Sequence, residues 1–390
     1  MVHLESGEIV SLYRTQTQSE NGPGVGAAAF HPSENRAVFI HGLESCSAEN
    51  PYSFARRFGA ILNVECPGII HHADARVVHG VDGSRRSAIG VLSGGTHAHS
   101  WNDRGWLSFT YNDAWLERTA RVDNRVRDAR TVGFMFPGNA PVEVNNGESF
   151  GGSMKAFLAA RLCEKAQPGS DEIEQAVEEC WIGRNGYIDN SGVHHANAIA
   201  FQGAVRNELG ELIHEVLICD LSIEELAKLE METWIDVGPG ELLLPVAGCR
   251  QRRLTHTASR RFPGIQGARN WLVSSPDGTC LYAPMRDERG IVQIHRIEIA
   301  SGRIDQLTQS EQSIEGQISL NPAGTHCSAI CDQRICLTDV RSGKSIWQTD
   351  HNGHRLIGAV HFSGENRMVY NRMVGDSSQG YVQVFTCEWM

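Results

Sequence analysis

Long apolar runs are missing from this 390-residue sequence, and none approaches the length needed to span a bilayer. Residues 1–10 also lack the basic start and the apolar core of a signal peptide. Basic residues are the minority charge, with 35 Lys and Arg against 46 Asp and Glu and a net charge of −11. We therefore expect a cytoplasmic protein, as the sequence is written, with no membrane partner and no nucleic-acid partner.

Paired cysteine motifs are also missing. The eleven cysteines are an odd number and include no C-x-x-C pair, which argues against a disulfide framework and against a Cys-type zinc site. We expect most of them to be small buried side chains. The phosphate-binding G-x-x-x-x-G-K-[ST] loop is absent as well, so a nucleotide-hydrolysing class loses its main support.

What the chain does contain is a repeat rich in glycine turns. Residues 273–308 read as an apolar strand, a Pro-Asp-Gly turn, a second strand, a polar turn, and a third strand before a Ser-Gly turn. Residues 318–349 repeat this order, and residues 360–387 form a third copy. Units of about 40 to 50 residues with several strands each are typical of β-propeller blades.

Earlier and more divergent copies begin at Ala27 and at His97. A further blade can be assembled from residues 153–163, 195–203 and 214–221, which makes six units. Residues 1–14 carry the Ser-Gly turn that joins a third to a fourth strand, so we infer a seventh blade whose inner strands are missing. The sequence thus predicts an all-β protein, a seven-bladed β-propeller forming one domain over residues 1–390, with an incomplete first blade at 1–20. Any signal peptide would then lie upstream, and the location would be periplasmic.

Two segments have the capping pattern of short helices. Residues 168–183 place Asp171 three residues before Glu174, and residues 222–233 place Ser222 three residues before Glu225. We predict a helical insertion at each.

The repeats resemble the TolB-type, WD40-like propeller repeat, in which strands alternate with S-P-D-G and R-D turns and end in L-T. Residues 30–42, 94–113, 167–183 and 251–264 look more specifically like the YidR-like family of bacterial propellers. This resemblance covers nearly the whole chain. It implies the fold, and it implies no activity, because the family has none assigned.

A more distant resemblance is to the oligogalacturonate lyases, also described as seven-bladed propellers. Those enzymes hold a divalent metal, usually manganese, with three His and one Gln, and cleave oligouronides by β-elimination. The resemblance places two of these ligands at His97 and His99, whereas Gly94 stands where the Gln is expected.

The residues themselves allow the same interpretation. Residues i and i+2 of a strand share a face, so His97 and His99 can present two imidazoles to one manganese or other divalent ion. Aligned blade turns suggest Gln317 and His361 as partners, and His195 is a further candidate. The alternative is that one imidazole packs between blades while the other is hydrated.

A basic segment at residues 249–262 offers a second candidate site. Arg260, Arg261 and His256 lie in it, and arginine forks suit the carboxylate of a uronate or another acidic ligand. The alternative is a solvated connector between blades. Six tryptophans, Trp347 among them, are expected to pack between blades instead of stacking on a sugar.

Two functional classes follow. In the first, the propeller binds an acidic carbohydrate over a divalent metal at the channel mouth, and as an enzyme it would be a metal-dependent oligouronide lyase. In the second, it is a TolB-like module that binds a protein partner and catalyses nothing. Propeller folds host many functions, so the sequence does not decide between them.

Overall fold

A computed structural model describes residues 1–77, 85–127, 129–140, 142, 146–229, 234–237, 241–266, 271–347, 355–375 and 380–389. These residues form two compact units. The first comprises residues 1–167, 171–181 and 219–251, and the second comprises residues 168–170, 182–218 and 252–390. No helix among the described residues is both long and apolar enough to cross a bilayer.

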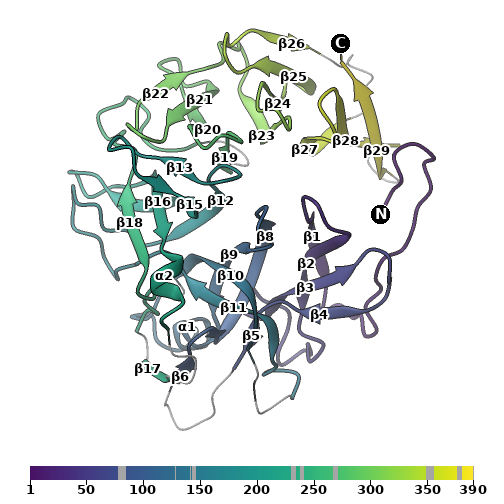
Figure 1. The fold of residues 1–390 in the computed structure, drawn as a ribbon, viewed down its shortest axis with the longest axis vertical. Coiled ribbons are helices and arrows are strands. Elements are labelled where there is room, and N and C mark those ends of the chain that lie inside the picture. Colours follow the sequence, from purple (N-terminus) through teal and green to yellow (C-terminus); the bar gives the residue numbers. More distant parts are fainter. Residues whose placement is uncertain are drawn as a thin grey trace. The chain divides into compact units, whose positions relative to one another are not determined.

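The chain is an all-β protein with a β-propeller fold, because it forms one antiparallel meander of strands after another (Figure 1). The first sheet contains β1 (Val25–Phe30), β2 (Arg36–Gly42), β3 (Arg57–Asn63) and β4 (Ile70–His72). The second contains β8 (Gly94–Trp101), β9 (Leu107–Asp113), β10 (Arg130–Ala140) and β11 (Gly152–Leu158). The third contains β12 (Ala176–Trp181), β15 (Ala198–Arg206), β16 (Leu212–Leu221) and β18 (Cys249–Arg253).

The later sheets keep strict chain order. The fourth contains β19 (Val273–Ser274), β20 (Cys280–Arg286), β21 (Val292–Glu298) and β22 (Ile304–Gln306). The fifth contains β23 (Ile314–Leu320), β24 (His326–Cys331), β25 (Arg334–Asp339) and β26 (Ser345–Trp347). The sixth contains β27 (Leu356–Phe362), β28 (Arg367–Val374) and β29 (Tyr381–Glu388).

Short elements decorate these sheets. Three two-stranded pairs are β5 (Ala75–Arg76) with β7 (Val91–Leu92), β6 (Arg85–Ala88) with β17 (Trp234–Val237), and β13 (Tyr187–Ile188) with β14 (His194–His195). The helices are α1 (Ala114–Ala120) and α2 (Ile223–Leu226).

The described residues form six blades, so the prediction of seven was wrong. Residues 1–14 contain no named strand, and the β-pairing within them is an isolated bridge between Val2 and Ile9. The Ser-Gly turn itself forms as predicted, because Gly7 N donates to His3 O just as Gly302 N donates to Glu298 O between β21 and β22. The motif therefore encodes the turn alone and does not add a blade.

Helix prediction succeeded once and failed once. The side chain of Ser222 accepts from Glu225 N and begins α2, which ends at Leu226, while residues 230–233 lie outside the described part of the chain. Residues 168–183 contain strand β12 in place of the predicted helix. There Thr110 donates to Glu179 and the Trp181 indole donates to Ser100 O, so alternate side chains are fixed to the second sheet.

Two further assignments need correction. Residues 153–163 supply β11 of the second sheet instead of a strand of the third. Helix α1, which Asp113 caps, was not predicted. The Asp113 carboxylate accepts from Trp115 N and Leu116 N, which is the pattern of an N-cap.

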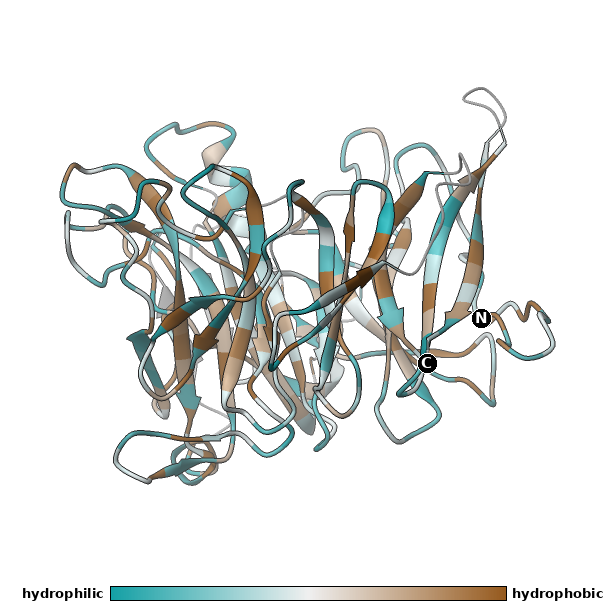
Figure 2. Cartoon of the chain, turned by 90° about the horizontal axis from the view of Figure 1, so that it is seen from above, coloured by the Kyte–Doolittle hydropathy of each residue, from teal (hydrophilic) through white to brown (hydrophobic). Residues whose placement is uncertain are grey.

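The core lies between successive sheets, and strand β24 shows how the sequence divides it. Cys327, Ala329 and Cys331 pack with residues of the fourth sheet, whereas Ile330 packs with the sixth. Apolar segments therefore run along the strands while the connecting loops are hydrophilic (Figure 2). All eleven cysteines lie in the described residues and none forms a disulfide there. Four are buried, six are half-buried and Cys66 is exposed, so the prediction that most of them are buried was wrong.

The L-T motif of the repeat acts as a clip between a strand and the connector that follows it. Thr308 Oγ1 accepts from Ile294 N at 2.9 Å and donates to Gln293 Oε1 at 2.8 Å. In the third sheet, Thr255 Oγ1 accepts from Val216 N in the same way and donates to Glu215. The motif thus satisfies polar groups that are buried inside the sheet.

We expect Thr308→Val to lower the free energy of unfolding by about 1 to 3 kcal/mol, because the isosteric methyl leaves Ile294 N and Gln293 Oε1 buried without this partner. The midpoint of urea denaturation measures the change. Thr386→Val, at an exposed position of β29, is the matched control and should change it by less than about 0.5 kcal/mol. Equal effects of the two substitutions would show that the hydrogen bonds of Thr308 contribute nothing to the free energy of unfolding.

Candidate functional site

His97 and His99 both lie on β8, but the strand is irregular between them. His97 pairs with Thr110 and Ser100 with Ser108, so two residues of β8 oppose one residue of β9. Ala98 takes the extra position with a left-handed φ of 56°. The bulge breaks the strict alternation on which the two-histidine prediction depends.

His99 belongs to a buried hydrogen-bonded chain. Its Nε2 lies 3.0 Å from Thr96 Oγ1, which donates to Asp74 Oδ1 at 3.0 Å, and Gly59 N donates to the same oxygen at 2.8 Å. Burial lowers the pKa of His99 to about 3 and raises the pKa of Asp74 to about 6. A neutral His99 held in this way joins β8 to the first sheet.

His97 has no such partner. Its side chain is buried, and neither ring nitrogen makes a hydrogen bond within the described residues. Its ring centroid lies 5.6 Å from that of Phe54. Burial, followed by the charges of Arg130 and Arg57, holds its pKa well below the ordinary value. His97 is therefore a neutral imidazole with an unused donor and an unused acceptor.

Two guanidinium groups share the Phe54 ring. The Cζ of Arg57 lies 4.4 Å and the Cζ of Arg130 lies 4.5 Å from its centroid. Arg130 Nε donates to Asn112 Oδ1 at 3.2 Å, and Arg57 Nε is buried with no hydrogen-bond partner in the described residues. Neither guanidinium forms an ion pair with a carboxylate there. We call Phe54, Arg57, His97 and Arg130 the Phe54 site.

The loop that carries Phe54 is held at both sides. Arg76, which is fully buried, donates to Ala55 O at 2.6 Å, and Ala55 N donates to Glu117 Oε2 at 3.1 Å. Glycine at position 95 lets this loop approach β8, because a Cβ there would lie 2.1 Å from Phe54 O. The site is thus fixed before any ligand arrives.

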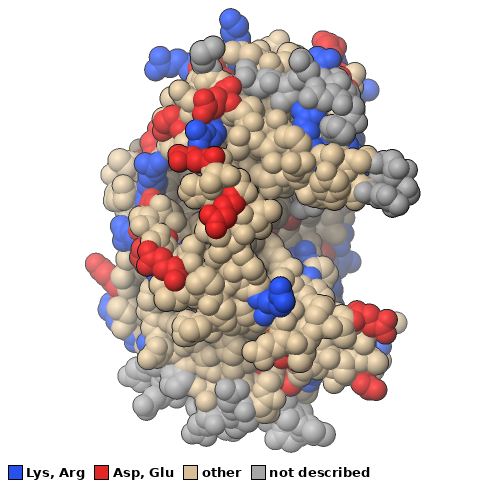
Figure 3. All heavy atoms as spheres, turned by 90° about the vertical axis from the view of Figure 1, so that its right-hand side faces the viewer, with Lys and Arg blue, Asp and Glu red and all other residues tan. Residues whose placement is uncertain are grey.

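This arrangement suits an anion. Two cations without counter-charges are costly at a partly buried position, and a carboxylate between them restores the balance. Phe54, with 45% of its surface exposed, offers an apolar face beside the charges. On the face drawn in Figure 3, acidic and basic side chains are interspersed.

A divalent metal, implied by the lyase resemblance, does not fit the surroundings of His97. The guanidinium groups of Arg57 and Arg130 oppose a cation there. Within the described ranges, no group of three or more His, Cys, Asp or Glu side chains is arranged to hold a metal ion. Manganese at His97 and His99 stays a prediction.

The other predicted ligands lie in the second unit. His195 Nε2 lies 3.1 Å from Asp189 Oδ2, and its ring stacks on Tyr187 with centroids 4.7 Å apart. Gln317 is half-buried in β23, and His361 lies on β27 with Nδ1 3.3 Å from Ser319 Oγ. His195 thus has a structural partner.

The predicted carboxylate-binding arginines contact backbone and ring atoms of neighbouring residues. Arg260 donates to Arg286 O and lies 3.2 Å from His295 Nε2, and Arg261 donates to Glu288 O at 2.9 Å. Burial and Arg260 lower the pKa of His295 to about 4, so that nitrogen is available as an acceptor. His256 is exposed.

One catalytic motif was overlooked in the sequence. Residues 147–151 read Gly-Glu-Ser-Phe-Gly, which matches the G-x-S-x-G pattern of serine hydrolases. Ser149, however, is buried in the loop before strand β11, where its amide donates to Asn146 Oδ1. A nucleophile elbow requires a strand-to-helix turn and an exposed serine, so this match is not one.

Comparison with known proteins identifies relatives of this chain by sequence. A family model described as "Protein of unknown function (DUF3748)" matches residues 24–149. The chain is 31% identical over 357 residues to the uncharacterized protein YidR of Escherichia coli (strain K12), covering 90% of this chain and 79% of YidR.

Solved structures share only low identity with the chain. A putative TolB from Agrobacterium tumefaciens is 13% identical with a TM-score of 0.40, over 83% of this chain and 80% of that protein. A puromycin hydrolase S511A mutant is 11% identical with a TM-score of 0.49, over 90% of this chain. The chain spans only 42% of that hydrolase. Such similarity says nothing of activity.

We expect Gly95→Ala to displace the loop around Phe54, because its methyl group cannot share space with Phe54 O. The readout is proteolysis in the loop at residues 51–57, which should become faster. Gly26→Ala, where nothing lies within 4 Å of the added carbon and the backbone is not left-handed, controls for loss of a glycine. Unchanged cleavage in the Gly95 variant would contradict the close approach.

Elemental analysis after dialysis against Mn²⁺ tests the metal prediction. Given the guanidinium groups, we expect the same substoichiometric metal content in the wild type and in the His97→Ala/His99→Ala variant. One equivalent of metal that is lost in the variant would restore the predicted site. His256→Ala, at an exposed position, serves as the control for general loss of an imidazole.

Proposed function

This chain belongs to the YidR family, and we propose that it binds a small acidic ligand, such as a uronate-containing carbohydrate, at the Phe54 site. The observation that supports this proposal is the pair of guanidinium groups on one half-exposed ring without a carboxylate partner. Carboxylate oxygens match the fork of an arginine side chain, which makes a charge-assisted hydrogen bond stronger than a neutral one.

Each residue of the site has a separate role. Arg57 and Arg130 neutralise the carboxylate, and the exposed edge of Phe54 contacts the apolar face of a sugar ring. His97 packs beside the Phe54 ring with both of its ring nitrogens buried. A neutral sugar lacks the carboxylate, so the site should bind it more weakly than an acidic sugar of the same shape.

The proposal requires no catalysis. A lyase would need a base placed at the carbon beside the carboxylate, and the ring nitrogens of His97, which are buried, would have to become accessible to it. An oligouronide lyase reaction is thus the enzymatic form of the same proposal, while a TolB-like interaction module is the alternative. Neither depends on a metal at this site.

Calorimetric titration with galacturonate, with galactose as the neutral match, tests the binding. We expect galacturonate to bind at least about tenfold more tightly, and the Arg57→Ala/Arg130→Ala variant to lose at least about tenfold in affinity. Affinity should stay constant from about pH 6 to about pH 8, because arginine remains charged and the pKa of His97 lies below this range.

Arg104→Ala removes an exposed arginine from the same unit and should leave the affinity unchanged. Equal binding of galactose and galacturonate, or full affinity in the double variant, would sink the proposal. Release of an unsaturated product from digalacturonate, followed by its absorbance, separates the lyase form from simple binding. Absence of any binding to acidic sugars favours the interaction module.

A further inference from the structure

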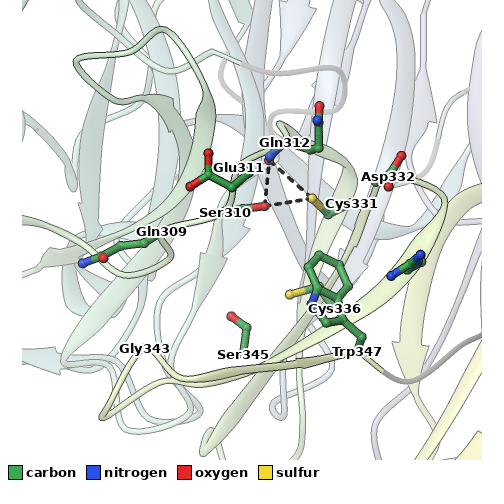
Figure 4. Close-up of a pocket in the computed structure, with 11 residues that line it drawn as sticks. Gln309, Ser310, Glu311, Gln312, Cys331, Asp332, Cys336, Gly343, Ser345 and Trp347 are labelled. Carbon is green, nitrogen blue, oxygen red and sulfur yellow. Dashed lines mark hydrogen bonds between the residues drawn. The ribbon is translucent and has the colours of Figure 1, made fainter.

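A second pocket lies in the fifth sheet and the loop before it, and it is independent of the Phe54 site. Its volume is about 370 Å³, within the range of small-molecule sites (Figure 4). The lining residues are Gln309, Ser310, Glu311, Gln312, Cys331, Asp332, Arg334, Cys336, Gly343, Ser345 and Trp347. They come from the loop before β23, the β24–β25 hairpin and the region around β26.

Part of this pocket is fixed by hydrogen bonds. Cys331 Sγ lies 3.1 Å from Ser310 Oγ and donates to Gln312 O at 3.3 Å, and Gln312 N donates to Ser310 Oγ. Burial raises the pKa of the Cys331 thiol, so it stays protonated and serves as a donor. These groups are already satisfied and form a rigid wall.

The charged side of the pocket is presented by a strained turn. Asp332 and Gln333 join β24 to β25 as a two-residue hairpin loop with left-handed φ values of 49° and 55°. The Gln333 side chain pins the turn, because its Oε1 accepts from Leu356 N at 3.0 Å and its Nε2 donates to Glu315 at 3.3 Å. Asp332 and Arg334 therefore stand on either side of one fixed residue.

Both of these charges are unpaired in the part of the chain that the structure describes. Arg334 makes no ion pair there, and its Nε is buried without a hydrogen-bond partner. Asp332 is exposed and likewise has no partner. Glu311, by contrast, is paired with Arg289 at 3.1 Å. One cation and one anion are thus left to meet a ligand.

Trp347 adds an apolar surface. It was expected to pack between blades, but 45% of its surface is exposed and it lines the pocket together with Ser345. It pairs with Cys336 across the strands, so its backbone position is fixed. An exposed indole is a large flat contact for an apolar group and for a cation.

We propose that this pocket binds a zwitterion of the size of one amino acid with an apolar side chain. The carboxylate binds Arg334, the ammonium group binds Asp332, and the side chain packs on Trp347. Arginine suits the carboxylate because its planar fork offers several donors, one of which is already desolvated. A ligand with only one charge would leave either Arg334 or Asp332 without a partner.

Saturation-transfer NMR with L-phenylalanine as the probe tests this proposal. We expect saturable binding in about the millimolar range, as is usual for so small a ligand. Phenethylamine lacks the carboxylate and 3-phenylpropionate lacks the ammonium group, so each should bind at least about tenfold more weakly. Trp347→Ala should lose the probe, whereas Trp347→Phe should retain part of the affinity.

Charge variants decide whether the named residues hold the probe. Arg334→Ala should weaken L-phenylalanine binding at least about tenfold, and Asp332→Asn should abolish the preference over 3-phenylpropionate. Arg341→Ala removes an exposed arginine of the same sheet and should change nothing. Unaltered melting temperatures confirm that each variant is folded.

Two results would overturn the assignment. One is the absence of saturable L-phenylalanine binding to the folded wild type. The other is full affinity in Arg334→Ala together with loss of affinity in the Arg57→Ala/Arg130→Ala variant, because the probe would then occupy the Phe54 site. Failure of galacturonate to bind would leave this pocket untouched, so the two proposals fail separately.

Discussion

A β-bulge in the first strand of a sheet is the constraint on which the placement of functional side chains depends. The register shifts in β1, β8, β23 and β27, where Ala27, Ala98, Gly316 and Gly358 have left-handed φ values. The irregularity adds one residue against the neighbouring strand in β1 and β8, and two residues in β23 and β27. In β8 this shift gives His97 to the Phe54 site and His99 to the buried chain with Thr96.

The Ser-Gly turns were readable in the sequence, because each depends on a hydrogen bond between residues close along the chain, and their repetition predicted the propeller fold. The blade number was not readable, since a turn motif at residues 1–14 says nothing of whether a strand follows it into a sheet. The prediction of a helix at residues 168–183 was wrong for a related reason. Its capping pattern is local, whereas Thr110 and Ser100 hold Glu179 and Trp181 from another sheet.

The candidate sites show the same limit. No glycine marks the bulge at Ala98 in the sequence. Strict alternation along β8 therefore predicted that His97 and His99 share a face. Arg57 and Arg130 are far apart in sequence, so no sequence pattern indicated that their side chains converge. Arg260 and Arg261 are adjacent in sequence and therefore predicted a ligand site, yet they donate hydrogen bonds to nearby backbone carbonyls. A run of like charges in sequence is therefore weaker evidence for a ligand than two separate cations that converge without a counter-charge.

The threonine clips have a consequence for how such a protein changes over evolution. Thr308 closes onto Gln293, and Thr255 onto Glu215, each within its own repeat. A whole repeat can then be gained or lost while every remaining repeat keeps its own threonine hydrogen bonds. Relatives with different numbers of blades would therefore need to adapt only the seams between neighbours, and a ligand site contained in one unit could survive the change.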